Sequence, residues 1–145
     1  MSIWWSLQLR REAASVPLAR RLLLGSMEAA GVDADISHEV SVALSEACAN
    51  AVQHGTGHSG VYRVTASVQG DVCRIEVTDC GPGFEAGAAV PRSEPFDLLT
   101  SGRGMCLIEA LSDAVSFDNL PGAGGAVVTF DKALRRRGER LLPTS

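Results

Sequence analysis

The stretch VYRVTASVQGDVCRIEVTD, residues 61–79, has the pattern of two strands joined by a tight turn. Apolar and polar residues alternate on both sides of Gln69-Gly70-Asp71, as in strands that bury one face of a sheet. A glycine between two such runs favours a hairpin turn. The stretch therefore predicts an antiparallel pair of strands in the middle of the chain.

Helical and strand-like patterns alternate on either side of this hairpin. In chain order, the expected elements are a strand over 5–10, a helix over 15–31 that stops at Gly31, a helix capped by Asp35 or Ser37 that ends at His54, the hairpin, a helix over 104–115, and a second hairpin over 114–131. This order predicts an α+β fold, a two-layer sandwich of helices over a mixed, mostly antiparallel sheet. We expect one domain over 1–145, with a basic, peripheral tail over 132–145.

The spacing of apolar residues predicts which face of each long helix is buried. In the first helix these residues are Val16, Leu22, Leu23, Met27 and Ala30. In the second they are Val40, Leu44, Ala47 and Ala51. Both helices are expected to pack these faces on the sheet.

Length and composition limit the class of protein. The chain has 145 residues, of which 46% are hydrophobic, so it is long enough for one domain with a real core. Its net charge is −4, and no basic stripe is interleaved with aromatic residues, which leaves direct nucleic-acid binding unsupported. No run of residues has the composition of a secretion signal or the length of a membrane span. We therefore expect a soluble, cytoplasmic protein without a membrane partner.

The positions of the four cysteines also favour a cytoplasmic protein. Cys48, Cys73, Cys80 and Cys106 form no CxxC pair and mostly lie in apolar runs, where cysteine packs as a small hydrophobic residue. This pattern suits a reducing compartment, although a disulfide between two of them stays open at this point.

A polar stripe crosses the second helix. In SEACANAVQHG, residues 45–55, Glu46, Asn50 and His54 follow at four-residue steps among small or apolar residues. Four residues advance about 400° around a helix, so the three side chains share one face. Such a stripe is either the polar edge of a partly exposed helix or the wall of a binding site.

Glycines and an acid follow the last strand of the hairpin. In IEVTDCGPGF, Gly81 lies two residues after Asp79, and Gly83 lies two residues after Gly81. By itself this arrangement is typical of an ordinary tight turn. The residues also fit a dinucleotide fingerprint formally, but no apolar helix follows, and that alternative fails. After a loop rich in glycine and proline, Gly102 and Gly104 stand at the start of a helix, where amides attract an anion.

Together, SEACANAVQHG, DCGPGF and SGRGMCLIEAL resemble the N, G1 and G2 boxes of the GHKL ATPase superfamily of gyrase, MutL and histidine kinases. GRGMCLIEALSD is most similar to the branch of bacterial anti-sigma-factor serine kinases. The likeness spans about residues 18–130. It implies the ATP-binding fold of that superfamily, the Bergerat fold, with ATP and Mg²⁺ as cofactors.

The resemblance also implies roles for individual residues. Asp79 would accept a hydrogen bond from the adenine amine, and Gly81 and Gly83 would let the backbone approach the base. Asn50 would bind Mg²⁺ through its side-chain oxygen. Glu46 would be the catalytic residue, receiving the proton of the attacking hydroxyl.

Further residues are implied less directly. Gly102, Arg103 and Gly104 would lie near the phosphates, with a solvent-facing Arg103 as the alternative. His54 matches the end of the N box, but we interpret it as a hydrogen-bonding residue of the helix end.

The chain departs from the family pattern near its end. It has Ala126 after Gly125 where the family has a threonine that helps to hold adenine through the acid and a water. By strand alternation, Thr129 faces the opposite side from Ala126.

The implied function is an ATP/Mg²⁺-dependent serine/threonine protein kinase that phosphorylates an anti-sigma-factor antagonist, binds a sigma factor and forms a homodimer. The alternative is a nucleotide-dependent binding module without kinase activity. A histidine-kinase fragment is disfavoured because no helical phosphoacceptor segment is seen before the domain.

Overall fold

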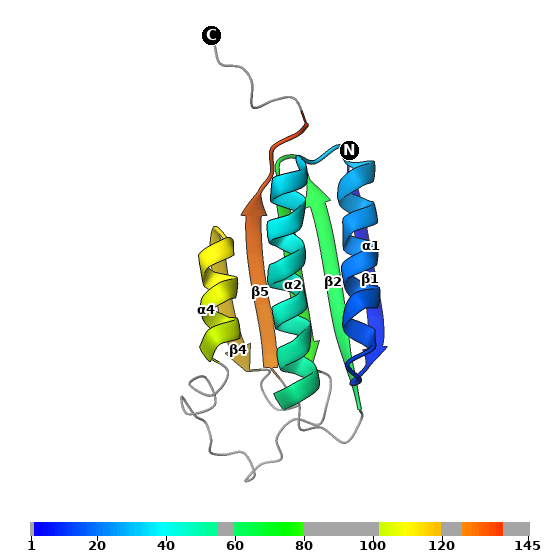
Figure 1. The fold of residues 1–145 in the computed structure, drawn as a ribbon, viewed down its shortest axis with the longest axis vertical. Helices are drawn as coiled ribbons and strands as arrows, with labels where there is room; N and C mark the ends of the chain where they lie inside the picture. Colours follow the sequence, from blue (N-terminus) through cyan, green and yellow to red (C-terminus); the bar gives the residue numbers. More distant parts are fainter. Residues whose placement is uncertain (1, 55–59, 80–101, 120–125, 138–145) are drawn as a thin grey trace.

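Three helices cover one face of a five-stranded sheet in the computed structural model, within the residues that it describes: 2–54, 60–79, 102–119 and 126–137 (Figure 1). The elements are β1 (Ser2–Arg10), α1 (Ser15–Ala29), α2 (Ala34–His54), β2 (Val61–Gln69), β3 (Val72–Asp79), α4 (Gly102–Leu111), β4 (Ala114–Asn119) and β5 (Ala126–Ala133). The two-layer α+β prediction is confirmed.

The sheet has the strand order β1-β2-β3-β5-β4, and every described pair is antiparallel. The expected, mostly antiparallel sheet is thus confirmed, and no parallel pair occurs among the described strands. Between β1 and β2 the chain makes two helical passes, α1 and α2, which return it to the end of the sheet that it left (Figure 1). A parallel neighbour needs a connection that crosses to the other end. The predicted pairing of β2 with β3, and of β4 with β5, is confirmed.

The register of the central hairpin determines which residues form the core. Gln69 pairs with Val72, and Gly70 takes a positive φ of 59° in the turn between them, a conformation that favours glycine. One face of the hairpin then carries its fully buried side chains: Tyr62, Val64, Ala66, Val68, Cys73, Ile75 and Val77. This face packs under the helices, and α2 lies in the middle of the helix layer between α1 and α4 (Figure 1).

The buried face of α2 agrees with the sequence, whereas that of α1 agrees only in part. All four apolar positions predicted for α2 are buried. In α1, Leu23 and Met27 are fully buried, but Leu22 is 41% exposed. Because α1 lies at the edge of the helix layer, it buries only a narrow stripe at four-residue spacing, and Leu22 falls outside it.

The start of α2 differs from the prediction, because the helix begins at Ala34, before either expected cap. Asp33 precedes it, and its carbonyl accepts the N–H of Ser37. The Asp33 carboxylate pairs with Arg135 at 2.9 Å, and its N–H donates to the Arg135 carbonyl at 2.6 Å. The residue before the helix is thus held by the far end of the chain.

The first residues of the expected peripheral tail, 132–134, are part of the folded domain. Lys132 and Ala133 belong to β5, Leu134 is buried, and Lys132 pairs with Glu39 of α2 at 2.8 Å. The first residues of the supposed tail are therefore part of the packed structure, and residues 138–145 lie outside the described ranges.

Two phenylalanines on neighbouring strands test the position of the core. Phe130 is 1% exposed, whereas Phe117 is 37% exposed. We expect Phe130→Ala to lower the free energy of unfolding by about 3–5 kcal/mol, the usual cost of a large buried cavity. Phe117→Ala, the matched control, should cost clearly less. Urea unfolding followed by circular dichroism measures both, and equal losses would contradict this core assignment.

Candidate functional site

Several predicted site segments meet at one end of the molecule. Figure 1 shows the C-terminal end of α2, the end of β3 and the start of α4 at the same end of the two layers. The chain leaves β1 at this end as well. Segments that are far apart in the sequence thus surround one region.

On α2, Glu46 and Asn50 lie one turn apart and are both half-buried. Their neighbours Ala47, Cys48 and Ala51 are buried in the core. The polar stripe therefore borders the packed face of the helix and is not a fully solvated edge. A carboxylate and an amide oxygen in this position can act as a proton acceptor and as a ligand for a hard cation.

Asp79 ends β3 on the face that the helices cover. It pairs across the sheet with Tyr62, whose side chain is fully buried. Its carboxylate forms an ion pair with the guanidinium of Arg11, which follows β1. The two side chains are only 13% and 10% exposed, so the pair is largely shielded from water.

The sequence prediction did not include Arg11. Side chains of β1 alternate, and Leu7 and Leu9 point toward the helices. Arg11 continues this spacing just beyond the strand, which is the signal that it belongs on the inner face. Its N–H donates to the Gly60 carbonyl at 2.8 Å, so the turn after β1 is attached to the start of β2.

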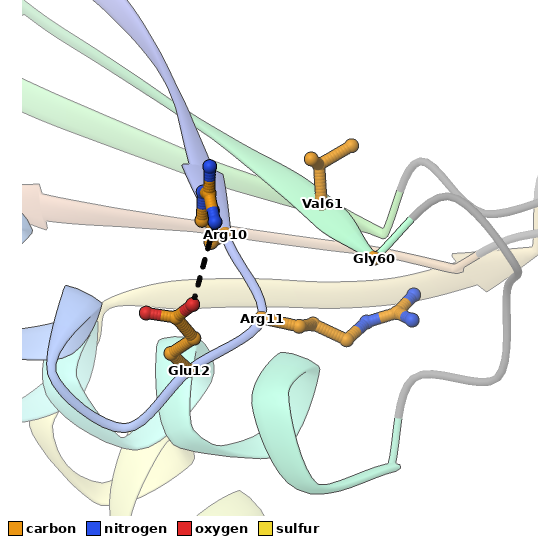
Figure 2. Close-up of a pocket in the computed structure, with 5 residues that line it drawn as sticks. All are labelled: Arg10, Arg11, Glu12, Gly60 and Val61. Carbon is orange, nitrogen blue, oxygen red and sulfur yellow. Dashed lines mark ion pairs between the residues drawn. The ribbon is translucent and has the colours of Figure 1, made fainter.

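A pocket of about 370 Å³ is lined by Arg10, Arg11, Glu12, Gly60 and Val61, which are drawn in Figure 2. Arg10 and Glu12 point toward one another and form an exposed ion pair of 3.8 Å. The Arg11 side chain extends away from them, toward the side of Gly60. Two adjacent arginines thus have different surroundings.

A buried polar group lies under this region and connects α1 to β2. The hydroxyls of Ser15 and Tyr62 are 2.6 Å apart, and Ser15 also donates to the Glu12 carbonyl at 2.7 Å. Burial raises the pKa of Tyr62 well above its usual range. Burial also raises the pKa of Cys48 to about 12, although a hydrogen bond with Tyr62 acts in the opposite direction on Cys48. These groups are neutral at physiological pH, and they support the site rather than react.

Other predicted site residues are located only in part. Gly102, Arg103 and Gly104 form the first turn of α4, as expected, but the side-chain placement of Arg103 is not described. Gly81 and Gly83 lie outside the described residues. His54 ends α2, and its side chain is likewise outside the description.

The departure near the end of the chain falls on β5. β3 and β5 pair up to Thr78 and Val127, and the next residue on each strand is Asp79 and Ala126. Thr129 pairs with Glu76 on one side and with Ser116 on the other. It lies three residues after Ala126, so its side chain is on the opposite face of the sheet. The predicted orientation of Thr129 is confirmed by this register.

A family model for the histidine kinase-like ATPase domain matches residues 9–132, from the end of β1 to the last residues of β5 and so most of the chain. The chain belongs to this family. The match includes α2, the end of β3 and the start of α4, the segments that meet at one end of the fold.

Curated proteins show which members of the family the chain is similar to. It is 29% identical over 141 residues to the serine-protein kinase RsbW of Staphylococcus aureus, with 89% of each chain covered. RsbW from the JH9 strain is 28% identical over the same length and coverage. The histidine kinase-like ATPase domain described here is thus a distant relative of RsbW serine kinases.

A solved structure agrees with the fold. A crystal structure of the RsbU and RsbW domains of a Mycobacterium tuberculosis protein superposes with a TM-score of 0.69 at 23% identity. The match covers 92% of this chain and 33% of that one, so this chain spans about a third of the length of the solved protein.

Among the described helices, none is long and apolar enough to cross a bilayer.

The burial of the cysteines can be measured by alkylation. Burial raises the pKa of Cys48 and Cys73 to about 12, whereas Cys106 on α4 is exposed. At pH 8 the buried thiols are therefore almost entirely protonated, and the thiol form does not react. Iodoacetamide on the folded protein should modify Cys106 first and leave the other two intact, as followed by peptide mass spectrometry. Alkylation of Cys48 at the rate of Cys106 would contradict the packing of α2.

Proposed function

We propose that this protein binds ATP and Mg²⁺ between α2 and the end of β3, and phosphorylates a serine or threonine of an anti-sigma-factor antagonist. We further propose that it binds a sigma factor, forms a homodimer and acts in the cytoplasm. One observation carries the proposal: the half-buried Glu46 and Asn50 of α2 and the inner-face Asp79 of β3 lie at the same end of a histidine kinase-like ATPase domain.

Asp79 suits recognition of adenine. A carboxylate offers only acceptors, and the exocyclic amine of adenine offers only donors. The burial of Asp79 strengthens such a hydrogen bond, because less water competes for it. In this proposal Gly81 and Gly83 let the backbone approach the base, since neither carries a Cβ.

Asn50 suits the metal. Mg²⁺ prefers oxygen ligands and keeps few protein ligands, the rest coming from phosphates and water, so one amide oxygen is enough. When bound, the ion neutralises charge on the phosphates. Gly102, Arg103 and Gly104 open α4, whose first turn offers backbone N–H groups to an anion.

Glu46 suits the transfer step, in which the serine hydroxyl oxygen forms a bond to the γ-phosphorus. The bond between that phosphorus and the β–γ bridging oxygen breaks, ADP leaves with the electron pair, and the hydroxyl proton passes to the Glu46 carboxylate. The relatives named serine-protein kinase support this reaction class.

Asp79→Asn tests the base assignment. An amide cannot replace a carboxylate that accepts from both Arg11 and the adenine amine, so we expect ATP binding to be lost in isothermal titration calorimetry. The variant also removes a charge from a shielded ion pair, so binding is measured well below its unfolding temperature. Glu76→Gln, on the opposite face of β3, is the matched control and should bind ATP normally. Unchanged affinity in Asp79→Asn would show that the base binds elsewhere.

Two substitutions on α2 separate metal binding from catalysis. Glu46→Gln removes the proton acceptor but no metal ligand, so MgATP affinity should be nearly unchanged while phosphoryl transfer falls by roughly two to four powers of ten. Asn50→Ala removes the metal ligand, so it should weaken Mg²⁺-dependent binding itself.

The comparison uses ATP titrations with and without Mg²⁺ and transfer from labelled ATP to candidate antagonist proteins. Gln53→Ala, an exposed position on the same helix, is the control for helix stability. Equal behaviour of the two site variants would overturn the separate roles. A wild-type protein that binds ATP and transfers nothing would favour the nucleotide-dependent binding module.

A further inference from the structure

The proposed ATP site does not account for the ion pair between Arg11 and Asp79. Arg11 lies beyond the end of β1, 68 residues before its partner, and both side chains are almost fully shielded. Shielding two charges costs free energy that their attraction offsets only with good geometry. A pair of this kind at the proposed base site therefore calls for an explanation.

The adjacent arginine provides an internal comparison. Arg10 has a side chain 80% exposed and pairs with Glu12 at 3.8 Å in open solvent. Exposed pairs of this kind contribute little to stability. Arg11 instead directs its guanidinium to the inner face, and its own N–H is fixed to the Gly60 carbonyl at 2.8 Å. Its side chain therefore starts from a fixed point next to β2.

The opposite side of Asp79 has a different chemistry. Along β5, the residue after the last pair of Thr78 with Val127 is Ala126, whose methyl group donates no hydrogen bond. The hydroxyl of Thr129 belongs to the other face of the sheet. The guanidinium of Arg11 thus donates to the Asp79 carboxylate from the β1 side of the sheet.

We propose that Arg11 is a positioning residue for base recognition: it holds one oxygen of the Asp79 carboxylate so that the other faces the amine of an adenine base. This inference rests on the proposed ATP site. A carboxylate has two oxygens and about four acceptor positions, so a group that accepts from a guanidinium can also accept from an amine. The charge-assisted bond also restrains rotation of the carboxylate, a restraint that Ala126 cannot supply.

The alternative is that Arg11 competes with adenine for Asp79. Displacement would then leave a guanidinium only 10% exposed without this carboxylate, which is costly for a buried charge. Binding beside the existing pair avoids that cost. The two possibilities predict opposite effects of removing Arg11.

The test compares ATP with inosine triphosphate, which has a carbonyl where adenine has its amine. Calorimetric titrations with Mg²⁺ use wild type, Arg11→Ala, Arg11→Lys and the matched control Arg10→Ala. In Arg11→Ala we expect ATP to bind at least about tenfold more weakly, the loss typical of a charged hydrogen-bond partner, while inosine triphosphate changes little. The preference for ATP should thus fall in Arg11→Ala and be unchanged in Arg10→Ala.

Further variants exclude a merely structural role. Arg11→Lys retains a charged donor without the planar fork, so it should fold and show an intermediate preference for ATP, which keeps the test decisive if Arg11→Ala is unstable. Adding Ala126→Thr to Arg11→Ala supplies a hydroxyl from β5 and should restore part of the preference.

Unchanged selectivity in Arg11→Ala and Arg11→Lys would overturn the positioning role. Tighter ATP binding in either variant would also overturn it, because Arg11 would then be a competitor. If wild type binds neither nucleotide, the proposed ATP site itself is wrong, which is a separate outcome.

Discussion

The register of the β2–β3 hairpin is the constraint on which the rest of the structure depends. Side chains of a strand alternate between faces, so the pairing of Gln69 with Val72 determines the face of every residue up to the pair of Tyr62 with Asp79. A slip by one residue would expose Ile75 and Val77 and move Asp79 to the outer face. Burial of the apolar set therefore holds the acid under the helices.

The small residues of α2 complete this arrangement. Ala43, Ala47 and Ala51 are buried, so the helix can lie close to the sheet between α1 and α4. Glu46 and Asn50 are carried at the border of that packed face, in the C-terminal half of α2, and this helix ends at the end of the molecule where β3 ends (Figure 1). The same packing that stabilises the core thus brings the polar stripe and Asp79 to one region, which is why fold and candidate site are inseparable here.

Local patterns predicted much of this, because they report on neighbours in the chain. Alternation revealed the hairpin, and helical spacing revealed the buried face of α2 and the stripe on its border. Contacts between distant residues were missed for the same reason. Asp33 with Arg135 sets the start of α2 across 102 residues, and Arg11 reaches Asp79 across 68. The exposure of Leu22 depends on the edge position of α1, which no period in the sequence encodes.

In the site that we propose, the Asp79 carboxylate, held by Arg11, recognises the base of a nucleotide bound against α2. The most direct measurement is a crystal structure with Mg²⁺ and a non-hydrolysable ATP analogue. We expect the adenine amine at about 3 Å from a carboxylate oxygen of Asp79, with Arg11 still bound to the other oxygen and the metal bound to the Asn50 side chain. A base bound away from Asp79 would show that this carboxylate does not recognise the nucleotide.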